Sequence, residues 1–273
     1  MPIIADYHLH THNSGDSTAP MADMIESAIQ KGLSEICFTE HMDMDYPTGY
    51  DLPDDPFILD VLSYKKELDE MKKRYEGRIK LKFGVEVGMQ TQIAKQNADF
   101  VSSYNFDFVI ASMHLVDRKD PYYKDMWEGK DSKDLIKRYF ESTLENIELF
   151  DNYDVLGHLD YVTRYAPDAD AVYRYELFSS YIDPILRHLA GRGKGLDLNS
   201  KMLGKDIKSS PNPCPEIISR FKELGGMVIT FGSDAHKPAP IACGFDRMQQ
   251  IAIDAGFREY FTFDKRNPIP HSL

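Results

Sequence analysis

The sequence lacks a disulfide framework and a membrane-spanning run, and we expect no secretory leader. Its 273 residues include only three cysteines, Cys37, Cys214 and Cys243, and no two of them form a CxxC pair. This usage is typical of reduced thiols, so we expect a cytoplasmic protein. No apolar run approaches the length that crosses a bilayer, and the first residues lack the basic and apolar regions of a signal peptide. We therefore expect no membrane partner.

Basic residues are also scarce. The chain has 32 lysines and arginines against 44 aspartates and glutamates, which gives a formal net charge of −12. The basic stretches at residues 65–66 and 72–74 alternate with acids, which is typical of a solvated helix face. Such a chain repels the phosphate backbone of nucleic acid, so we expect no nucleic-acid partner. Carboxylates that bind cations are one source of such an acidic excess.

No linker rich in glycine, serine or proline divides the chain, and no repeat or low-complexity tract is present. Strand-like and helix-like runs instead alternate along the whole length, which predicts seven βα units in a single domain, residues 1–273. The predicted helices are residues 19–31, 57–75, 90–102, 132–150, 173–190, 215–224 and 244–255. Parallel strands in this number imply an α/β sheet that is closed, or nearly closed, into a TIM-like barrel, with the active site at the carboxyl ends of the strands.

The first strand carries a His-x-His pair. Side chains on a strand alternate between its faces, so His8 and His10 point the same way and can both bind one metal ion. Alone this signal is weak, because most such pairs are incidental. The question is whether other strands supply matching ligands at the same end of the barrel.

Polar side chains at or near the ends of the other predicted strands could supply further metal ligands at the same end of the barrel. Each histidine alone is more often a satisfied polar group, but independent accidents would scatter over helices and over both barrel ends. Glu86 lies within an apolar strand, where a carboxylate without a partner is costly. The metal-ligand candidates are His8, His10, Asp16, His41, Glu86, His114, His158, Asp234 and His236.

These positions fall in a set of motifs with a known counterpart. The set resembles the PHP (polymerase and histidinol phosphatase) superfamily, and most closely its monofunctional histidinol-phosphatase branch. The resemblance covers almost the whole chain in order. The motifs are Asp6-Tyr7-His8-Leu9-His10-Thr11 with Ser14 and Asp16, Thr39-Glu40-His41, Gly84-Val85-Glu86, Ser112-Met113-His114, Gly157-His158-Leu159-Asp160 and Gly232-Ser233-Asp234-Ala235-His236.

The resemblance implies a distorted (β/α)7 barrel with three divalent transition-metal ions. One ion would take His8, His10, Glu86 and Asp234. A second would take Glu86, His114 and His158, with the Glu86 carboxylate as a bridge. A third would take Asp16, His41 and His236. Mixed imidazole and carboxylate ligands suit Zn, Mn or Fe, and the sequence does not choose among them.

The expected chemistry is phosphoester hydrolysis. Two cations that share a carboxylate can hold a bridging hydroxide for attack on phosphorus, and no P-loop or nucleophile elbow is present. We expect Glu86, Asp234, His236 and Arg164 to be catalytic, with Arg164 as a phosphate clamp. Expected substrate contacts are Arg164, His41, Asp117 and Lys205. Glu40, Asp43, Asp117 and Asp160 are candidates to orient histidine ligands or to contact a substrate amine.

One departure concerns the substrate. The histidinol-phosphatase branch usually has an arginine where this chain has Gly204, and Lys201 or Lys205 would replace it only as a point charge. The leading hypothesis is hydrolysis of L-histidinol phosphate, a small phosphate monoester. Alternatives are another small phosphate monoester or a nucleotide, hydrolysis of a carbon–nitrogen bond, and a PHP module without activity. The roles of the loops at residues 42–56 and 116–130, and the oligomeric state, stay open.

Overall fold

The computed structural model describes residues 2–203 and 210–273, and its centre is a sheet of seven parallel strands in which each strand pairs with the next in the sequence. The strands are β1 (Ala5–Leu9), β2 (Glu35–Met42), β3 (Lys80–Gly88), β4 (Phe108–Ser112), β5 (Val155–Leu156), β6 (Gly195–Asn199) and β7 (Ile229–Gly232). At the seam, Leu9 forms a parallel bridge with Ala235. There the amide of Asp234 donates to the His8 carbonyl at 2.8 Å, so the sheet closes into a distorted (β/α)7 barrel.

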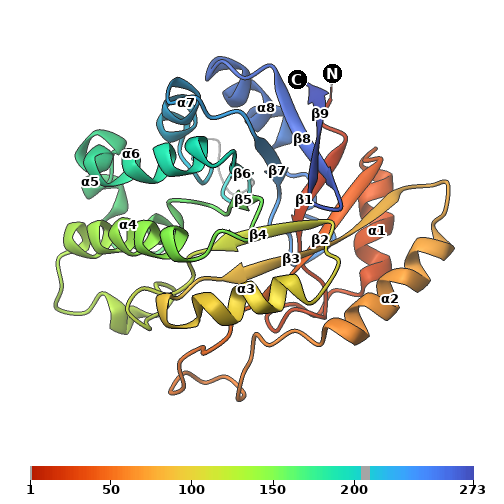
Figure 1. Cartoon of the computed structure of the whole chain (residues 1–273), viewed down its shortest axis with the longest axis horizontal. Helices are drawn as coiled ribbons and strands as arrows, with labels where there is room; N and C mark the ends of the chain where they lie inside the picture. Colours follow the sequence, from red (N-terminus) through yellow and green to blue (C-terminus); the bar gives the residue numbers. More distant parts are fainter. Residues whose placement is uncertain (1, 204–209) are drawn as a thin grey trace.

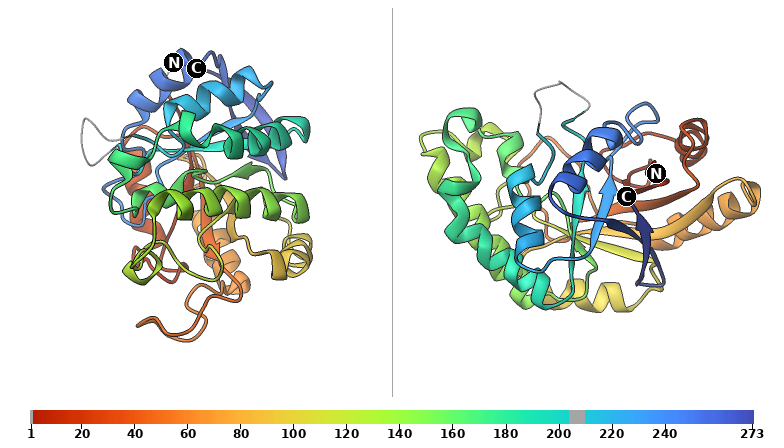
Figure 2. Two further views of the ribbon diagram at one scale, coloured as in Figure 1. Left: turned by 90° about the vertical axis from the view of Figure 1, so that its left-hand side faces the viewer. Right: turned by 90° about the horizontal axis from the view of Figure 1, so that it is seen from above.

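Helices connect the strands and form the outer layer of the barrel (Figures 1 and 2). They are α1 (Met21–Gln30), α2 (Val61–Arg74), α3 (Ala94–Ser102), α4 (Ser132–Leu149), α5 (Ala169–Val172), α6 (Tyr175–Gly191), α7 (Pro215–Glu223) and α8 (Phe245–Asp254). The structure confirms the fold class that the alternating pattern predicts. None of the helices in residues 2–203 and 210–273 combines the length and apolar character that a membrane crossing requires.

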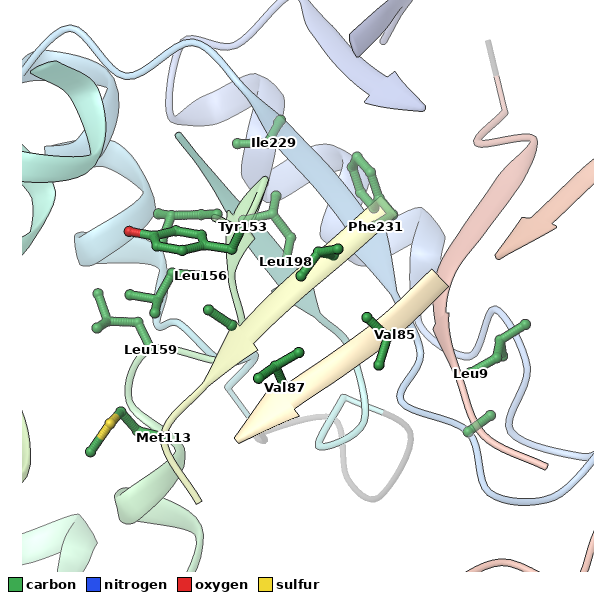
Figure 3. Close-up of a cluster of buried hydrophobic side chains, with 14 of the residues drawn as sticks. Leu9, Val85, Val87, Met113, Tyr153, Leu156, Leu159, Leu198, Ile229 and Phe231 are labelled. Atoms are coloured by element: carbon green, nitrogen blue, oxygen red, sulfur yellow. The ribbon is translucent and has the colours of Figure 1, made fainter. Parts of the chain in front are cut away.

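Apolar side chains on alternate positions of the strands fill the space between sheet and helices. Figure 3 shows Val85 and Val87 on β3, Leu198 on β6 and Phe231 on β7 within this core. Since side chains alternate along a strand, the residues between them face the interior of the barrel. Glu86, which lies between Val85 and Val87, is consequently completely buried inside it.

A hairpin closes the amino-terminal end of the barrel. Strands β8 (Glu259–Asp264) and β9 (Asn267–Ser272) pair antiparallel to each other. Phe263 on β8 packs on Phe108 inside the barrel, with ring centroids 4.9 Å apart, and joins Tyr7 in the same apolar cluster. The interior is therefore apolar at this end and polar at the other.

The element boundaries differ from the prediction at two informative places. Helix α2 begins at Val61 rather than at residue 57, because Asp60 caps it by accepting from the Ser63 amide at 3.1 Å. Strand β9 is absent from the prediction, since Pro268 and Pro270 argue against a strand. The strand forms because it is exposed and pairs on one side only, so its prolines interrupt no ladder.

Candidate metal centre

A change of register in β1 aims its histidines into the barrel. Between Asp6 and Leu9 the strand has one more residue than its partner β2, which is the geometry of a β-bulge. As a result Tyr7 and His8, although adjacent, both face the interior: Tyr7 packs on Phe108, and His8 contacts Glu86. Asp6 points to the neighbouring loop instead, where it accepts from the amides of Ser233 and Ala242, both at 3.0 Å.

Glu86 lies at the middle of a cluster of five histidines. Its Oε2 is 3.2 Å from His8 Nε2, 3.4 Å from His10 Nε2 and 3.1 Å from His41 Nδ1. Its Oε1 is 3.0 Å from His158 Nε2 and 3.2 Å from His114 Nε2. Both oxygens of one carboxylate thus meet imidazole nitrogens from different strands, which is the arrangement that a carboxylate bridging two cations requires.

A second group of candidates lies at the rim of this cluster. Asp16 Oδ2 is 3.0 Å from His236 Nε2 and 3.6 Å from His41 Nε2. The ring of His10 stacks between those of His41 and His236, at centroid distances of 4.2 and 4.3 Å. His10, His41 and His236 offer nitrogen atoms within 4.8 Å of one another. The structure therefore brings all nine predicted ligand candidates to one end of the barrel.

Several histidines are oriented by hydrogen bonds on the ring side away from Glu86. Asp197 Oδ2 is 2.8 Å from His8 Nδ1, and Asp43 Oδ1 is 2.6 Å from His114 Nδ1. Ser14 Oγ lies 3.0 Å from His10 Nδ1. The Ser14 hydroxyl donates to Glu40 at 2.6 Å, so Glu40 acts on His10 through it. Such contacts fix the ring orientation and leave the opposite nitrogen for a cation.

The buried polar atoms test whether cations fit this cluster. In the part of the chain that the structure describes, Nε2 of His8 and His10, Nδ1 of His41 and Oε2 of Glu86 are buried without a hydrogen-bond partner. Orphaned acceptors are costly in a protein interior, and here they converge on one space. Imidazole and carboxylate donors in that number fit divalent transition metals.

The protonation states of the cluster also favour the binding of cations. Burial alone would raise the pKa of Glu86, but His8, His114 and His41 hold it well below its usual value, so the carboxylate is ionised. Burial lowers the pKa of His158 to about 3, which keeps that ring neutral. Burial opposes protonation of His8 too, yet Glu86 and Asp197 raise its pKa. A cation bound here would displace that proton and take its place beside Glu86.

Arg164 is a buried group at the edge of the centre. Its Nη1 is 3.0 Å from Asp234 Oδ2, and it donates to the side-chain oxygens of Asn212 and Asn199 at 2.7 and 2.8 Å. Lys201 Nζ is 2.9 Å from Asp234 Oδ1. Two positive groups therefore flank Asp234. Burial opposes the ionisation of this carboxylate, but Lys201, His8 and Arg164 outweigh it and hold the pKa of Asp234 well below its usual value.

Two predicted residues have other partners, and a third is not described. Asp117 does not face the centre: it forms an ion pair with Arg138 at 2.9 Å and its side chain is 61% exposed, because the turn at residues 117–118 directs it to solvent. Asp160 orients no histidine. It accepts from Asn212 at 2.6 Å and so supports Arg164 indirectly. Lys205, like Gly204, lies outside the described residues.

A cavity of about 820 Å³ opens beside the cluster. Its walls include Asp16, His41, Glu86, His114, His158, Arg164, Lys201, Asp234 and His236. The cavity is also lined by Tyr46, Tyr122, Tyr123 and Asp120, which come from the loops at residues 42–56 and 116–130, whose roles the sequence leaves open. The centre is thus open to a small molecule on one side.

Sequence comparisons connect this centre with known proteins. The model of the PHP domain family matches residues 6–201. A histidinol-phosphatase of Lactococcus lactis subsp. lactis (strain IL1403) is 33% identical over 259 residues, which cover 94% of this chain and 93% of that protein. A probable histidinol-phosphatase of Clostridium acetobutylicum is 32% identical, over 97% of this chain and 98% of that protein.

Solved structures agree. The crystal structure of histidinol phosphate phosphatase from Lactococcus lactis, complexed with Zn, L-histidinol and phosphate, has a TM-score of 0.88 and 32% sequence identity, covering 97% of this chain and 98% of that one. A putative histidinol phosphatase from Listeria monocytogenes has a TM-score of 0.75 at 20% identity, covering 89% of this chain and 99% of that one. The second likeness concerns the fold alone.

Proposed function

The chain belongs to the PHP domain family, and on that premise we propose that it is a metal-dependent phosphomonoesterase that hydrolyses L-histidinol phosphate to L-histidinol and phosphate. The observation that carries this proposal is the position of Glu86, whose two carboxylate oxygens meet five imidazoles at the floor of an open cavity. The relative from Lactococcus lactis supports the substrate, because it was crystallised with both reaction products.

We propose three cation sites. His8, His10, Glu86 and Asp234 would hold the first; Glu86, His114 and His158 the second; and Asp16, His41 and His236 the third. The groupings are supported by contacts of 3.0 to 3.4 Å from Glu86 and by the Asp16–His236 contact of 3.0 Å. The donor set suits Zn, Mn or Fe, and the Lactococcus lactis structure held Zn.

When bound, such cations would supply hydroxide at neutral pH and neutralise charge on the phosphoryl group. The protein's own contribution is position and charge. Arg164 lines the cavity with a fork of donors that suits phosphoryl oxygens, and Lys201, in the same lining, adds a second positive charge. His236 Nδ1 and Asp234 Oδ1 lie 3.5 Å apart at the same rim, where the two side chains would contact the substrate or the cations.

We place the reaction in the cytoplasm and in a single barrel domain, without a nucleic-acid partner. The three cysteines are free, which fits a reducing compartment. The net charge of −12 opposes binding to nucleic acid. A small phosphate monoester remains the partner that the cavity suits.

The test is a substrate panel on protein of known metal content. We expect about three transition-metal ions per chain by elemental analysis, and turnover of L-histidinol phosphate that exceeds that of unrelated phosphomonoesters and nucleotides by about 100-fold or more in kcat/KM. A chelator should abolish activity, and Zn or Mn should restore it. Equal turnover of all monoesters would remove L-histidinol phosphate as the substrate. Absence of both metal and hydrolysis would leave a PHP module without activity.

A further inference from the structure

Asp120 lies in the wall of the cavity that opens beside the metal centre, and it is only 8% exposed. Its Oδ2 accepts from the Tyr46 hydroxyl at 2.6 Å, and its Oδ1 accepts from the Tyr122 amide at 2.8 Å. Within residues 2–203 and 210–273, no lysine, arginine or histidine forms an ion pair with it. Both hydrogen-bond donors are neutral and burial disfavours the negative charge of Asp120, so a cation bound beside the carboxylate would stabilise that charge.

Aromatic rings surround this carboxylate. Tyr46 packs edge-on against Phe57 at a centroid distance of 4.8 Å, and Tyr122 packs in the same way against Tyr165 at 5.6 Å. Tyr161 continues the wall towards the metal centre, since its ring lies 5.2 Å from that of Tyr165 and 4.9 Å from that of His158. The cavity thus runs from histidines at one end to a carboxylate among aromatic faces at the other.

The two loops that build this wall are tied together before any substrate binds. Arg118 pairs with Asp45 across the two loops, and Gln90, which follows β3, holds the first loop by donating to the Met44 and Asp45 carbonyls at 2.9 and 3.2 Å. The ring of Tyr50 stacks on Tyr123 at a centroid distance of 3.8 Å. A preformed pocket loses little entropy on binding and can therefore discriminate between ligands.

We propose that Asp120 and the tyrosines around it form the subsite that binds the positively charged nitrogen of the substrate. A carboxylate flanked by aromatic faces attracts a cation through both its charge and the ring quadrupoles. L-Histidinol phosphate carries an ammonium group at neutral pH, and its imidazole gains a proton in acid, so its organic part supplies such a cation. This inference rests on the proposed function, because it names the part of the active site that selects the leaving alcohol.

A purely structural role for Asp120 is the competing explanation. The Tyr46–Asp120 hydrogen bond joins the two loops, but a neutral acceptor would serve that purpose at lower cost. The two roles predict different kinetics. Loss of the charge should harm only cationic substrates, whereas loss of a loop contact should harm every substrate.

The test compares Asp120→Asn with wild type on L-histidinol phosphate and on p-nitrophenyl phosphate. Asparagine keeps the size of the side chain and removes the charge. Its oxygen can still accept from the Tyr122 amide, while its NH2 group can donate to the Tyr46 hydroxyl. We expect kcat/KM for L-histidinol phosphate to fall about tenfold or more, mainly through KM, and kcat/KM for p-nitrophenyl phosphate to stay within about twofold. Asp125→Asn is the matched control, because Asp125 lies in the same loop but its side chain is 51% exposed and outside the cavity wall.

Two further measurements complete the design. Tyr46→Phe removes the loop contact and keeps both the carboxylate and the aromatic ring that the subsite uses. The ratio of kcat/KM for L-histidinol phosphate to that for p-nitrophenyl phosphate should therefore stay within about twofold of wild type. An analogue without the amine identifies the nitrogen: if Asp120→Asn no longer affects its turnover, the ammonium is the bound group, and if the effect persists, it is the imidazole. Equal losses on both substrates, or a Tyr46→Phe variant that behaves like Asp120→Asn, would overturn the subsite. Wild-type protein that does not hydrolyse L-histidinol phosphate would instead refute the proposed function.

Discussion

At the scale of single residues, the metal centre depends on groups that the ligand motifs do not contain. Asp197 is completely buried on β6 and contacts His8 Nδ1 at 2.8 Å, which turns the other ring nitrogen toward Glu86. It also contributes to the raised pKa of His8, together with Glu86 and against the effect of burial. Asp197 therefore holds both the orientation and the charge of His8.

Asp197→Asn should weaken metal binding without unfolding the protein. The amide can still accept from His8, but it no longer supplies the negative charge that increases the basicity of the ring. We expect the affinity for the most tightly held metal to fall about 10- to 100-fold, measured by competition with a chromophoric chelator. Asp99→Asn, at a position 65% exposed on α3, is the control and should change nothing. Unaltered affinity in Asp197→Asn would show that His8 needs no such partner.

The sequence predicts the metal-ligand candidates better than it predicts the residues that orient them. Histidines and acids at strand ends share one location by the topology of the barrel, so their convergence follows from the strand assignment. Asp197 was missed because its partner lies 189 residues away. A weak signal existed: Asp197 interrupts the apolar strand Gly195–Asn199, and an acid inside such a strand requires a buried partner.

At the scale of the elements, the bulge in β1 is the feature that pattern reasoning could not supply. Strict alternation places Tyr7 and His8 on opposite faces, yet both lie inside the barrel. The extra residue between Asp6 and Leu9 reverses the alternation, so the apolar cluster and the metal centre both draw on this one strand. Nothing in the local residue types marks that change of register.

The close approach of β7 to β1 leads to a prediction for Gly232. A Cβ atom at this position would lie 2.4 Å from the Cβ of His8 and 2.6 Å from Oδ1 of Asp197, inside any allowed contact distance. Gly232→Ala should therefore lower the free energy of unfolding by about 1–3 kcal/mol and displace His8, with loss of bound metal. Chemical denaturation and elemental analysis measure the two effects.

Gly191→Ala is the matched control for that substitution. Gly191 ends α6, and a Cβ there meets no atom within 4 Å. It should leave metal content unchanged and should stabilise the protein slightly, by about 0.5 kcal/mol, because alanine favours the helix. A Gly232→Ala protein as stable and as metal-rich as the control would mean that the seam between β1 and β7 is looser than the structure shows.

At the scale of the whole molecule, the barrel separates stability from chemistry. The amino-terminal end is filled by apolar side chains and closed by the β8–β9 hairpin, while the carboxyl end holds the polar centre and the cavity. This division is the general plan of such barrels, and it makes the two ends independently testable. The second strand of that hairpin could not be predicted, since it contains two prolines.

Phe263→Ala should destabilise the protein and leave its chemistry intact. Phe263 is 3% exposed and packs on Phe108, and its backbone amide donates to the Tyr7 hydroxyl at 2.9 Å. Removal of the ring would leave a cavity at the amino-terminal end of the barrel and lower the free energy of unfolding by about 3–4 kcal/mol.

Ile269→Ala on the same hairpin is the control, because Ile269 is 41% exposed and its loss should cost little. In both variants kcat/KM, measured well below the melting temperature, should stay within about twofold of wild type, since the metal centre lies at the opposite end. If Phe263→Ala lost activity in proportion to stability, the two ends of the barrel would be coupled, and the hairpin would belong to the catalytic apparatus rather than to the scaffold.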